Sequence, residues 1–130
     1  MATKRRRRKK KYKTGVHNST KAGLCKYRSG WELEYMKFLD SNVQVVSYSY
    51  EKVIVPYISN IRSGRIRRYF PDFLIEYSDG RKVLVEIKPS NRLNKPINVK
   101  KLLAAKQWCK EHDVTLEVIT EVELRGLGLL

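Results

Sequence analysis

The chain has 130 residues, and its 28 Lys and Arg against 13 Asp and Glu give a formal net charge of +15. This length fits one small domain with an appendage, and a hydrophobic content of 42% is enough for one modest core. No stretch approaches the roughly 18 consecutive apolar residues of a membrane span, and no apolar stretch follows the basic N-terminus as it does in a secretory signal. The two cysteines, Cys25 and Cys109, lack the spacing of a metal site. Reduced thiols are therefore expected, and a Cys25–Cys109 disulfide is the alternative that the sequence leaves open.

The N-terminal segment is the most basic part of the chain. Residues 1–13 hold nine Lys or Arg and no acid, which leaves a charge of +6 for residues 14–130. Because such dense like charge resists packing, residues 1–24 are expected to form a disordered arm and linker, and residues 25–130 the folded domain. A polyanion is the expected partner of the arm, and a solubility tail or a nuclear address is the alternative. The candidate DNA contacts in the arm are Arg5, Arg6, Arg7 and Arg8.

The hydrophobic pattern of the remaining chain predicts alternating helices and strands. Ser29 is a suitable N-cap and Glu32 follows three residues later, which predicts a capping box and a helix from Ser29 to about Asp40. A stripe formed by Leu102, Ala105 and Cys109 predicts a second helix from Asn98 to about Glu111. Runs of β-branched and aromatic residues predict five strands, at residues 43–50, 52–58, 67–77, 81–88 and 114–120. The order α-β-β-β-β-α-β predicts an α/β fold, built on a mixed sheet of the α+β kind.

A hairpin in the middle of the chain carries the most informative charges. Ser78-Asp79-Gly80 predicts a three-residue hairpin loop, because glycine suits the left-handed third position of that loop. The loop pairs Glu76 with Lys82 and Leu74 with Leu84, and both pairs are favourable across two antiparallel strands. One face of the hairpin is then almost wholly apolar, and a slip of one residue would expose it to water. The residues of that face are Tyr69, Phe73, Ile75, Val83, Val85 and Ile87.

The same register places Asp72 directly opposite Glu86, with Lys88 on the same face. Two facing carboxylates repel each other, more strongly where the site is partly buried, so a positive group is expected between them. Lys88 partly meets this need, and a divalent cation such as Mg²⁺, which prefers oxygen ligands, meets it better. The alternative is a surface salt-bridge cluster. Pro71 cannot donate to a ladder, and a bulge there would change which way Asp72 faces.

Pro71-Asp72 and Glu86-Ile87-Lys88, separated by thirteen residues, resemble the motif of the PD-(D/E)XK nuclease superfamily. Longer strings around this short motif make the resemblance more specific. They are similar to the head-completion nucleases of tailed phages and to the N-terminal nuclease domain of TnsA-type transposon proteins, over about residues 26–121. These strings are residues 27–33, 38–42, 54–57, 68–73 and 85–89.

The resemblance implies a restriction-endonuclease-like core and Mg²⁺-dependent hydrolysis of DNA phosphodiester bonds, with Mn²⁺ expected to substitute. It implies that Asp72, Glu86 and the backbone carbonyl of Ile87 bind the ion. Lys88 is then expected to orient the attacking water and to stabilise charge. Glu32 matches the family's helix-borne acid, which makes it a candidate catalytic residue and a further metal ligand. The alternative is that Glu32 only caps its helix.

Four cations near these residues are candidate contacts for DNA phosphates: Arg28, Arg67, Arg68 and Lys106. Ordinary surface charge is the alternative for each of them. The two histidines, His17 and His112, have no partner spacing and are expected at the surface.

The resemblance also bears on the biological setting. The short length and the strings around Trp31 and Phe38 favour the phage branch over the TnsA branch, which usually carries a further C-terminal domain. DNA is then the expected partner, together with phage head, neck or other assembly proteins that the leucine-rich C-terminus could contact. The expected location is the cytoplasm of the host cell or the virion. A TnsA-like transposon-end nuclease and a non-catalytic nucleic-acid-binding assembly protein are the rival hypotheses.

Overall fold

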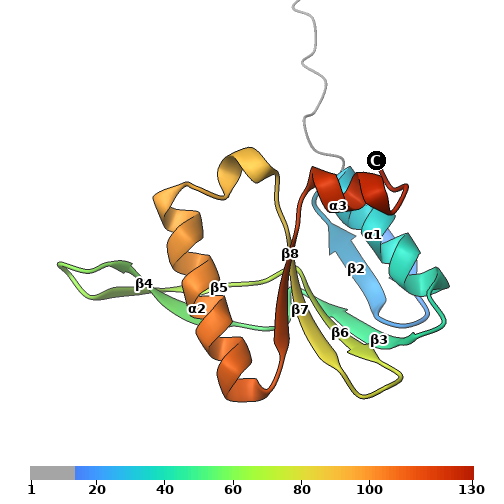
Figure 1. Ribbon diagram of the computed structural model, residues 1–130, viewed down its shortest axis with the longest axis horizontal. Coiled ribbons are helices and arrows are strands. Elements are labelled where there is room, and N and C mark those ends of the chain that lie inside the picture. The colour runs from blue at the N-terminus through green and yellow to red at the C-terminus, as the bar shows by residue number, and fades with distance from the viewer. Residues whose placement is uncertain (1–13) are drawn as a thin grey trace, which may run out of the picture.

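The computed structural model describes residues 14–130, so the predictions for the basic arm, including Arg5 to Arg8, lie outside the described residues. A four-stranded sheet in the order β3-β6-β7-β8 forms the centre. Neighbouring strands are antiparallel except β7 and β8, which are parallel. Helix α2 lies on one side of the sheet, and helix α1 with an N-terminal hairpin lies on the other (Figure 1). The bounds are β3 Val45–Tyr50, β6 Phe73–Tyr77, β7 Lys82–Ile87, β8 Thr115–Ile119, α1 Gly30–Ser41 and α2 Pro96–His112. The predicted mixed α+β sheet is confirmed, and the arrangement is compatible with a restriction-endonuclease-like core.

Helix α1 begins where the sequence predicts. The Ser29 side chain accepts a hydrogen bond from the Glu32 N–H at 3.2 Å, which caps the helix. The predicted return bond differs, because the Glu32 carboxylate accepts from the N–H of Arg28 and not from that of Ser29. Glu32, Tyr35 and Leu39 are buried on one face of this helix.

Two hydrophobic cores hold the sheet between its helices. The first packs Phe73, Ile75 and Val85 against α1, and it confirms the predicted apolar face of the hairpin except for Tyr69. The second packs Leu84 against Ala105 and Cys109 of α2. Both faces of the sheet are therefore covered, which explains why β7 is apolar along nearly its whole length.

The strand predicted at residues 67–77 is wrong, because the chain breaks at Pro71. β5 (Arg65–Tyr69) ends before the proline and pairs only with β4 (Val55–Asn60), in a separate two-stranded sheet. Pro71 has no N–H to donate to a ladder, so β6 begins only at Phe73. As a consequence, Tyr69 lies in the second core and not on the predicted face with Phe73.

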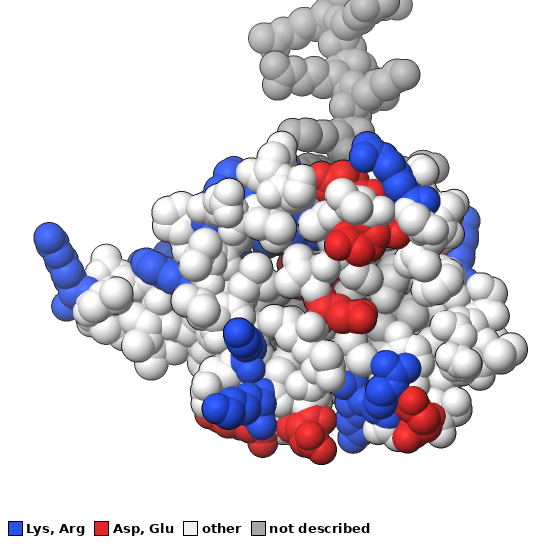
Figure 2. All heavy atoms as spheres, viewed as in Figure 1, with Lys and Arg blue, Asp and Glu red and all other residues white. Residues whose placement is uncertain are grey.

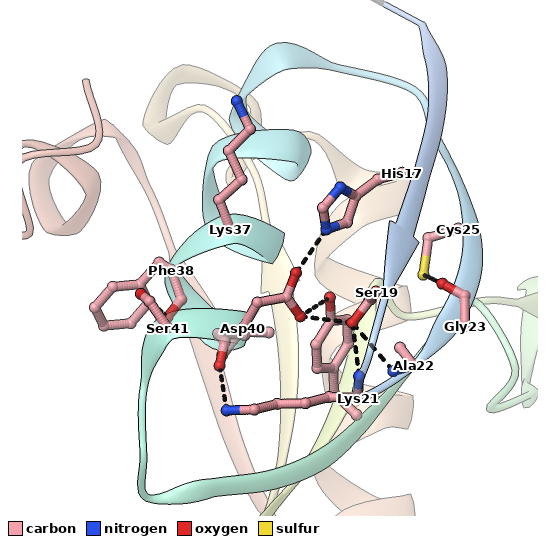
Figure 3. Close-up of polar contacts among 12 residues, drawn as sticks. His17, Ser19, Lys21, Ala22, Gly23, Cys25, Lys37, Phe38, Asp40 and Ser41 are labelled. Atoms are coloured by element: carbon pink, nitrogen blue, oxygen red, sulfur yellow. Dashed lines mark hydrogen bonds and ion pairs between the residues drawn. The ribbon is translucent and has the colours of Figure 1, made fainter.

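The assignment of residues 15–24 to an arm and linker is also wrong. They form β1 (Gly15–Ser19) and the start of β2 (Gly23–Tyr27), which pair in an antiparallel hairpin. The hairpin is fixed to the domain through the Asp40 carboxylate, which contacts Nε2 of His17 at 2.6 Å and Oγ of Ser19 at 2.5 Å (Figure 3). His17, expected at the surface, is therefore largely covered, with 19% of its side chain exposed.

Further hydrogen bonds complete this attachment. The hydroxyl of Tyr48 on β3 donates to Asp40 at 2.9 Å. Nζ of Lys21 donates to the carbonyls of Leu39 and Asn42 at 2.9 and 2.6 Å, which satisfies acceptors at the C-terminus of α1. The hairpin is thus joined to both α1 and the central sheet.

The C-terminus packs back on the domain. A short helix α3 (Glu121–Gly126), absent from the predicted order, starts at a capping box made by Thr120 and Glu123. Its Leu124 is fully buried in the first core. A short 3-10 helix, Ser90–Arg92, connects β7 to α2. None of the helices from residue 14 onward combines the length and apolarity that crossing a bilayer requires. Both cysteines are free and buried.

We expect Asp40→Ala to lower the free energy of unfolding at neutral pH by about 2 kcal/mol, since a charged acceptor of several hydrogen bonds is lost. Burial alone would raise the pKa of Asp40, but hydrogen bonds from Ser19, His17 and Tyr48 outweigh it and hold the pKa below its ordinary value. The stabilisation is therefore present above the ordinary aspartate pKa and is lost as the pH falls through the folded pKa.

Chemical denaturation of wild type and variant at neutral pH and below about pH 3 tests this. The difference in free energy of unfolding between wild type and Asp40→Ala should be smaller at low pH than at neutral pH. Glu34→Gln, on the exposed side of the same helix, should change little at either pH. If Asp40→Ala lowered the free energy of unfolding equally at both pH values, the Asp40 carboxylate would not stabilise the fold through its charge.

Candidate functional site

A cleft of about 1020 Å³ opens where the start of α1, the end of β7 and the start of α2 meet. Four acids line it, namely Glu32, Glu51, Asp72 and Glu86. Six Lys or Arg side chains also line it, namely Arg28, Arg68, Lys88, Arg92, Lys95 and Lys101. The cations around the cleft can attract a phosphate backbone, and the acids at its floor can provide a charged reaction centre.

Asp72 and Glu86 lie together at the floor of this cleft. The β6–β7 ladder pairs Leu74 with Leu84 and Phe73 with Val85, which confirms the predicted register. Asp72 lies one residue beyond the last paired position, and its Oδ2 accepts a hydrogen bond from the Ile87 N–H at 2.7 Å. Pro71 therefore ends the strand without turning Asp72 to the opposite face.

The two carboxylates are buried at an electrostatic cost. Only 7% of Asp72 and 6% of Glu86 are exposed. Burial raises the pKa of Asp72 well above its ordinary value, and the charges of Glu86 and Glu32 raise it further. Burial also raises the pKa of Glu86, although the Tyr69 hydrogen bond and the charge of Lys88 oppose the rise. The site therefore favours the arrival of positive charge.

Lys88 is held between the acids and helix α2. Its Nζ lies 3.7 Å from Oε1 of Glu86 and donates to Oδ1 of Asn98 at 3.0 Å. Asn98 is buried, and its Nδ2 donates to the backbone carbonyl of Arg92 at 2.7 Å, which fixes the amide. Sequence reasoning missed Asn98, because only the fold brings the start of α2 beside the end of β7.

Glu32 reaches the same cleft from α1. Glu32 is 9% exposed, and its carboxylate accepts hydrogen bonds from the Arg28 N–H at 2.9 Å and from the Tyr50 hydroxyl at 2.6 Å. Burial raises its pKa, although these two hydrogen bonds lower it. Capping alone does not account for a carboxylate that is buried beside Asp72, so a catalytic role for Glu32 stays a prediction with a favourable position.

Three further residues support the site, and their roles there were not predicted. The hydroxyl of Tyr69 donates to the Glu86 carboxylate, and Lys101 lies above the Tyr69 ring at 5.6 Å from its centre. Glu51 adopts a left-handed backbone with φ of 51°, and its N–H donates to the Asp72 carbonyl at 2.9 Å. The break after Tyr69, which the sequence pattern did not reveal, produces the contact between Tyr69 and Glu86.

The predicted phosphate contacts divide into two groups. Arg28 and Arg68 line the cleft, and Arg28 also pairs with Glu51 at 3.1 Å. Arg67 and Lys106 do not line it. Arg67 precedes Arg68 in β5 and so points to the opposite face of the strand. On α2 the cleft-lining lysine is Lys101, which lies three residues after Asn98 and thus on the same face of the helix.

The oxygen donors at the floor of the cleft suit one kind of divalent cation. Among residues 14–130, no group of three or more His, Cys, Asp or Glu side chains is arranged to hold a metal ion. The candidate donors are the two carboxylates and the Ile87 carbonyl. This set fits Mg²⁺, which typically binds through one or two carboxylates and keeps several of its waters. It does not fit Zn²⁺, which takes three or four protein ligands, mostly His or Cys.

Comparison with known proteins agrees with this geometry. Residues 42–121 match the family described as the TnsA-like endonuclease N-terminal domain. The chain belongs to this family. The TnsA-like match includes Asp72, Glu86 and Lys88 and begins after Glu32. The chain is also 28% identical over 124 residues to the head completion nuclease of Enterobacteria phage T4, covering 78% of this chain and 82% of that protein. The predicted resemblance to both groups is confirmed.

We expect Asp72→Asn to melt at a higher temperature than wild type in EDTA at neutral pH. The amide oxygen can still accept the Ile87 hydrogen bond, while the buried charge that repels Glu86 is removed. Differential scanning calorimetry measures the shift. The matched control is Glu76→Gln on the same strand, where the charge is exposed and faces Lys82, so no rise is expected. A clear fall for Asp72→Asn would mean that neighbouring donors already satisfy the carboxylate.

Proposed function

We propose that this TnsA-like domain is a Mg²⁺-dependent endonuclease that hydrolyses phosphodiester bonds in DNA. One observation carries the proposal: two buried carboxylates, Asp72 and Glu86, lie beside Lys88 in an open cleft lined by cations. Burying two like charges is unfavourable and Lys88 offsets only part of the repulsion, so a ligand that brings further positive charge relieves it. Family membership supports endonuclease activity in general.

Asp72, Glu86 and the Ile87 carbonyl would hold the ion, with Glu32 reaching it through a bound water. When bound, Mg²⁺ supplies a Lewis acid at the scissile phosphate and lowers the pKa of a bound water, and Mn²⁺ should supply the same chemistry. Tyr69 fixes the Glu86 carboxylate through its hydroxyl, which leaves the other carboxylate oxygen to face the cleft and Lys88.

Lys88 and the cleft cations would act on the DNA itself. Asn98 holds the ammonium group of Lys88 near Glu86, where it can orient the attacking water and stabilise charge on the phosphate. Arg28, Arg68 and Lys101 border the cleft and would bind neighbouring phosphates, which sets the position of the scissile bond. The work of these residues is mainly positioning and charge stabilisation.

The biological role we favour is that of a phage head-completion nuclease. The T4 head completion nuclease matches this chain over most of the length of both proteins, which supports the phage setting over a transposon-end nuclease. In that setting the further partners are head, neck or other assembly proteins, in the host cytoplasm or in the virion. A TnsA-like role in cleavage at transposon ends is the second candidate, and the family match favours it.

The direct test is cleavage of DNA by the full chain. Wild type should nick or cut DNA in Mg²⁺ and not in EDTA, and Asp72→Asn or Glu86→Gln should slow cleavage by at least about 100-fold. Mg²⁺ should also raise the melting temperature of wild type but not of the two variants, because ligand binding stabilises the folded state. Linear, circular, single-stranded and branched DNA should be compared. Wild-type cleavage rates in either variant would refute the site.

The variant Lys88→Met distinguishes the role of the lysine in catalysis from the role of the two carboxylates in binding the metal. This variant should lose cleavage by about 100-fold or more but keep the rise in melting temperature on adding Mg²⁺, because both carboxylates remain. Asn98→Ala should lower the rate by about 10-fold, since Lys88 loses the acceptor that positions it. Loss of the Mg²⁺ response in Lys88→Met, or an unchanged rate in both variants, would contradict these roles. Lys110→Met, at the other end of α2, is the matched control for Lys88→Met and should behave as wild type.

A further inference from the structure

The β4–β5 hairpin extends away from the central sheet as a two-stranded ribbon (Figure 1). Its segment is unusual in charge, because residues 52–71 contain five Lys or Arg and no Asp or Glu. Those cations are Lys52, Arg62, Arg65, Arg67 and Arg68. In Figure 2 the Lys and Arg atoms at the far left, where the ribbon ends, have no acidic atoms beside them on the visible face. A segment with this charge attracts a polyanion and repels a partner whose surface is also basic.

Apolar side chains on the ribbon are exposed among these cations. Ile61 in the turn is 83% exposed, and the cross-strand pair Ile58 and Ile66 is 53% and 67% exposed. Arg62 and Arg65 flank the turn and are exposed as well. Apolar groups next to arginines suit the floor of a DNA groove, where base edges and sugars lie between two rows of phosphates.

The ribbon is firmly joined to the domain at the other end. Val55, Tyr57 and Tyr69 are buried in the second core against α2. Nζ of Lys100 on α2 donates to the Ser59 carbonyl at 2.9 Å, which holds the β4 strand further along its length. A ligand on the ribbon is therefore held in a fixed place relative to α2.

The ribbon also begins at the candidate active site. Arg68 lines the cleft, and the next residue, Tyr69, donates to Glu86. A five-residue strand such as β5 spans about 17 Å, roughly half of one helical turn of duplex DNA. Duplex DNA with a phosphate over the two carboxylates would therefore continue along the ribbon.

We propose that the β4–β5 ribbon lies in a groove of double-stranded DNA next to the cleavage position, with Arg62 and Arg65 on phosphates and Ile58 and Ile66 toward the groove floor. A two-stranded ribbon fits the major groove, which is about 12 Å wide. The proposal rests on the proposed function, in that DNA is the substrate, and it deepens that function by naming duplex as the form bound. Charge favours DNA over a protein partner, because no acid interrupts the ribbon.

The test compares two double variants of the full chain with equal loss of charge. Arg62→Ala/Arg65→Ala removes ribbon cations, and Lys82→Ala/Lys110→Ala removes exposed cations at the ends of β7 and α2 that lie away from the cleft. Binding to a 30-base-pair duplex and to a single strand of equal length is measured in EDTA over a range of salt. All three proteins should have the same melting temperature, because the replaced side chains are exposed.

The ribbon variant should reduce the slope of log affinity against log salt by about 2 on duplex DNA, and less on the single strand. The control variant should leave the slope near that of wild type. Hydroxyl-radical footprinting should show protection about half a turn to one side of the cleft-bound phosphate in wild type, lost in the ribbon variant.

Equal losses in both variants, or an equal effect on single-stranded DNA, would overturn the groove assignment. So would unchanged duplex binding, even if the ribbon variant lost binding to an assembly protein. The outcome is separable from that of the proposed function. Duplex binding that depends on the ribbon, without any Mg²⁺-dependent cleavage, would support the ribbon proposal and refute the nuclease. Mg²⁺-dependent cleavage with duplex binding that does not depend on the ribbon would support the nuclease and refute the ribbon proposal.

Discussion

The repulsion between Asp72 and Glu86 is the constraint on which the rest of the site depends. Two carboxylates with raised pKa values persist at less than a tenth exposure because donors surround them: the Ile87 N–H, the Tyr69 hydroxyl and the Lys88 ammonium. These donors lower the cost of burial without removing it. The remaining cost of burying the two charges must be offset by hydrophobic packing, and the sheet has a hydrophobic core on each face. The two buried charges thus lie at the edge of a sheet that is covered on both faces.

Topology explains why residues distant in sequence meet at this point. β7 and β8 are parallel, so the chain must cross over between them, and helix α2 makes that crossover. The crossover starts at the end of β7, which brings Asn98 and Lys101 beside Glu86 and Lys88. Helix α1 contributes its first turn to the same place. Every acidic or cationic group at the floor of the cleft therefore comes from the end of an element or from a connection, positioned by strands whose interiors are apolar.

The sequence was informative wherever short-range rules decide the structure. Gly80 and the favourable Leu74–Leu84 pair define the β6–β7 register, so Asp72 and Glu86 were predicted on one face of the hairpin. Ser29 defines the start of α1, but Glu32 of that helix was assigned to the site only through the resemblance to the nuclease superfamily. The two main failures have different causes, one local and one long-range. Tyr69 was misplaced because Pro71 interrupts the alternation on which the prediction relied. The N-terminal hairpin was missed because its strands are short, and Asp40, more than twenty residues further on, fixes them.

The same break at Pro71 joins the proposed DNA-binding ribbon to the candidate active site. Because β5 leaves the central sheet, its last residue, Tyr69, can contact Glu86 while its earlier residues extend into solvent. The ribbon cannot swing without withdrawing Val55, Tyr57 and Tyr69 from the second core, and that movement would release Glu86. DNA bound along the ribbon would then have one orientation relative to the two carboxylates. Phosphodiester hydrolysis gains most from such fixed geometry, since a displacement of about 1 Å can cost about 100-fold in rate.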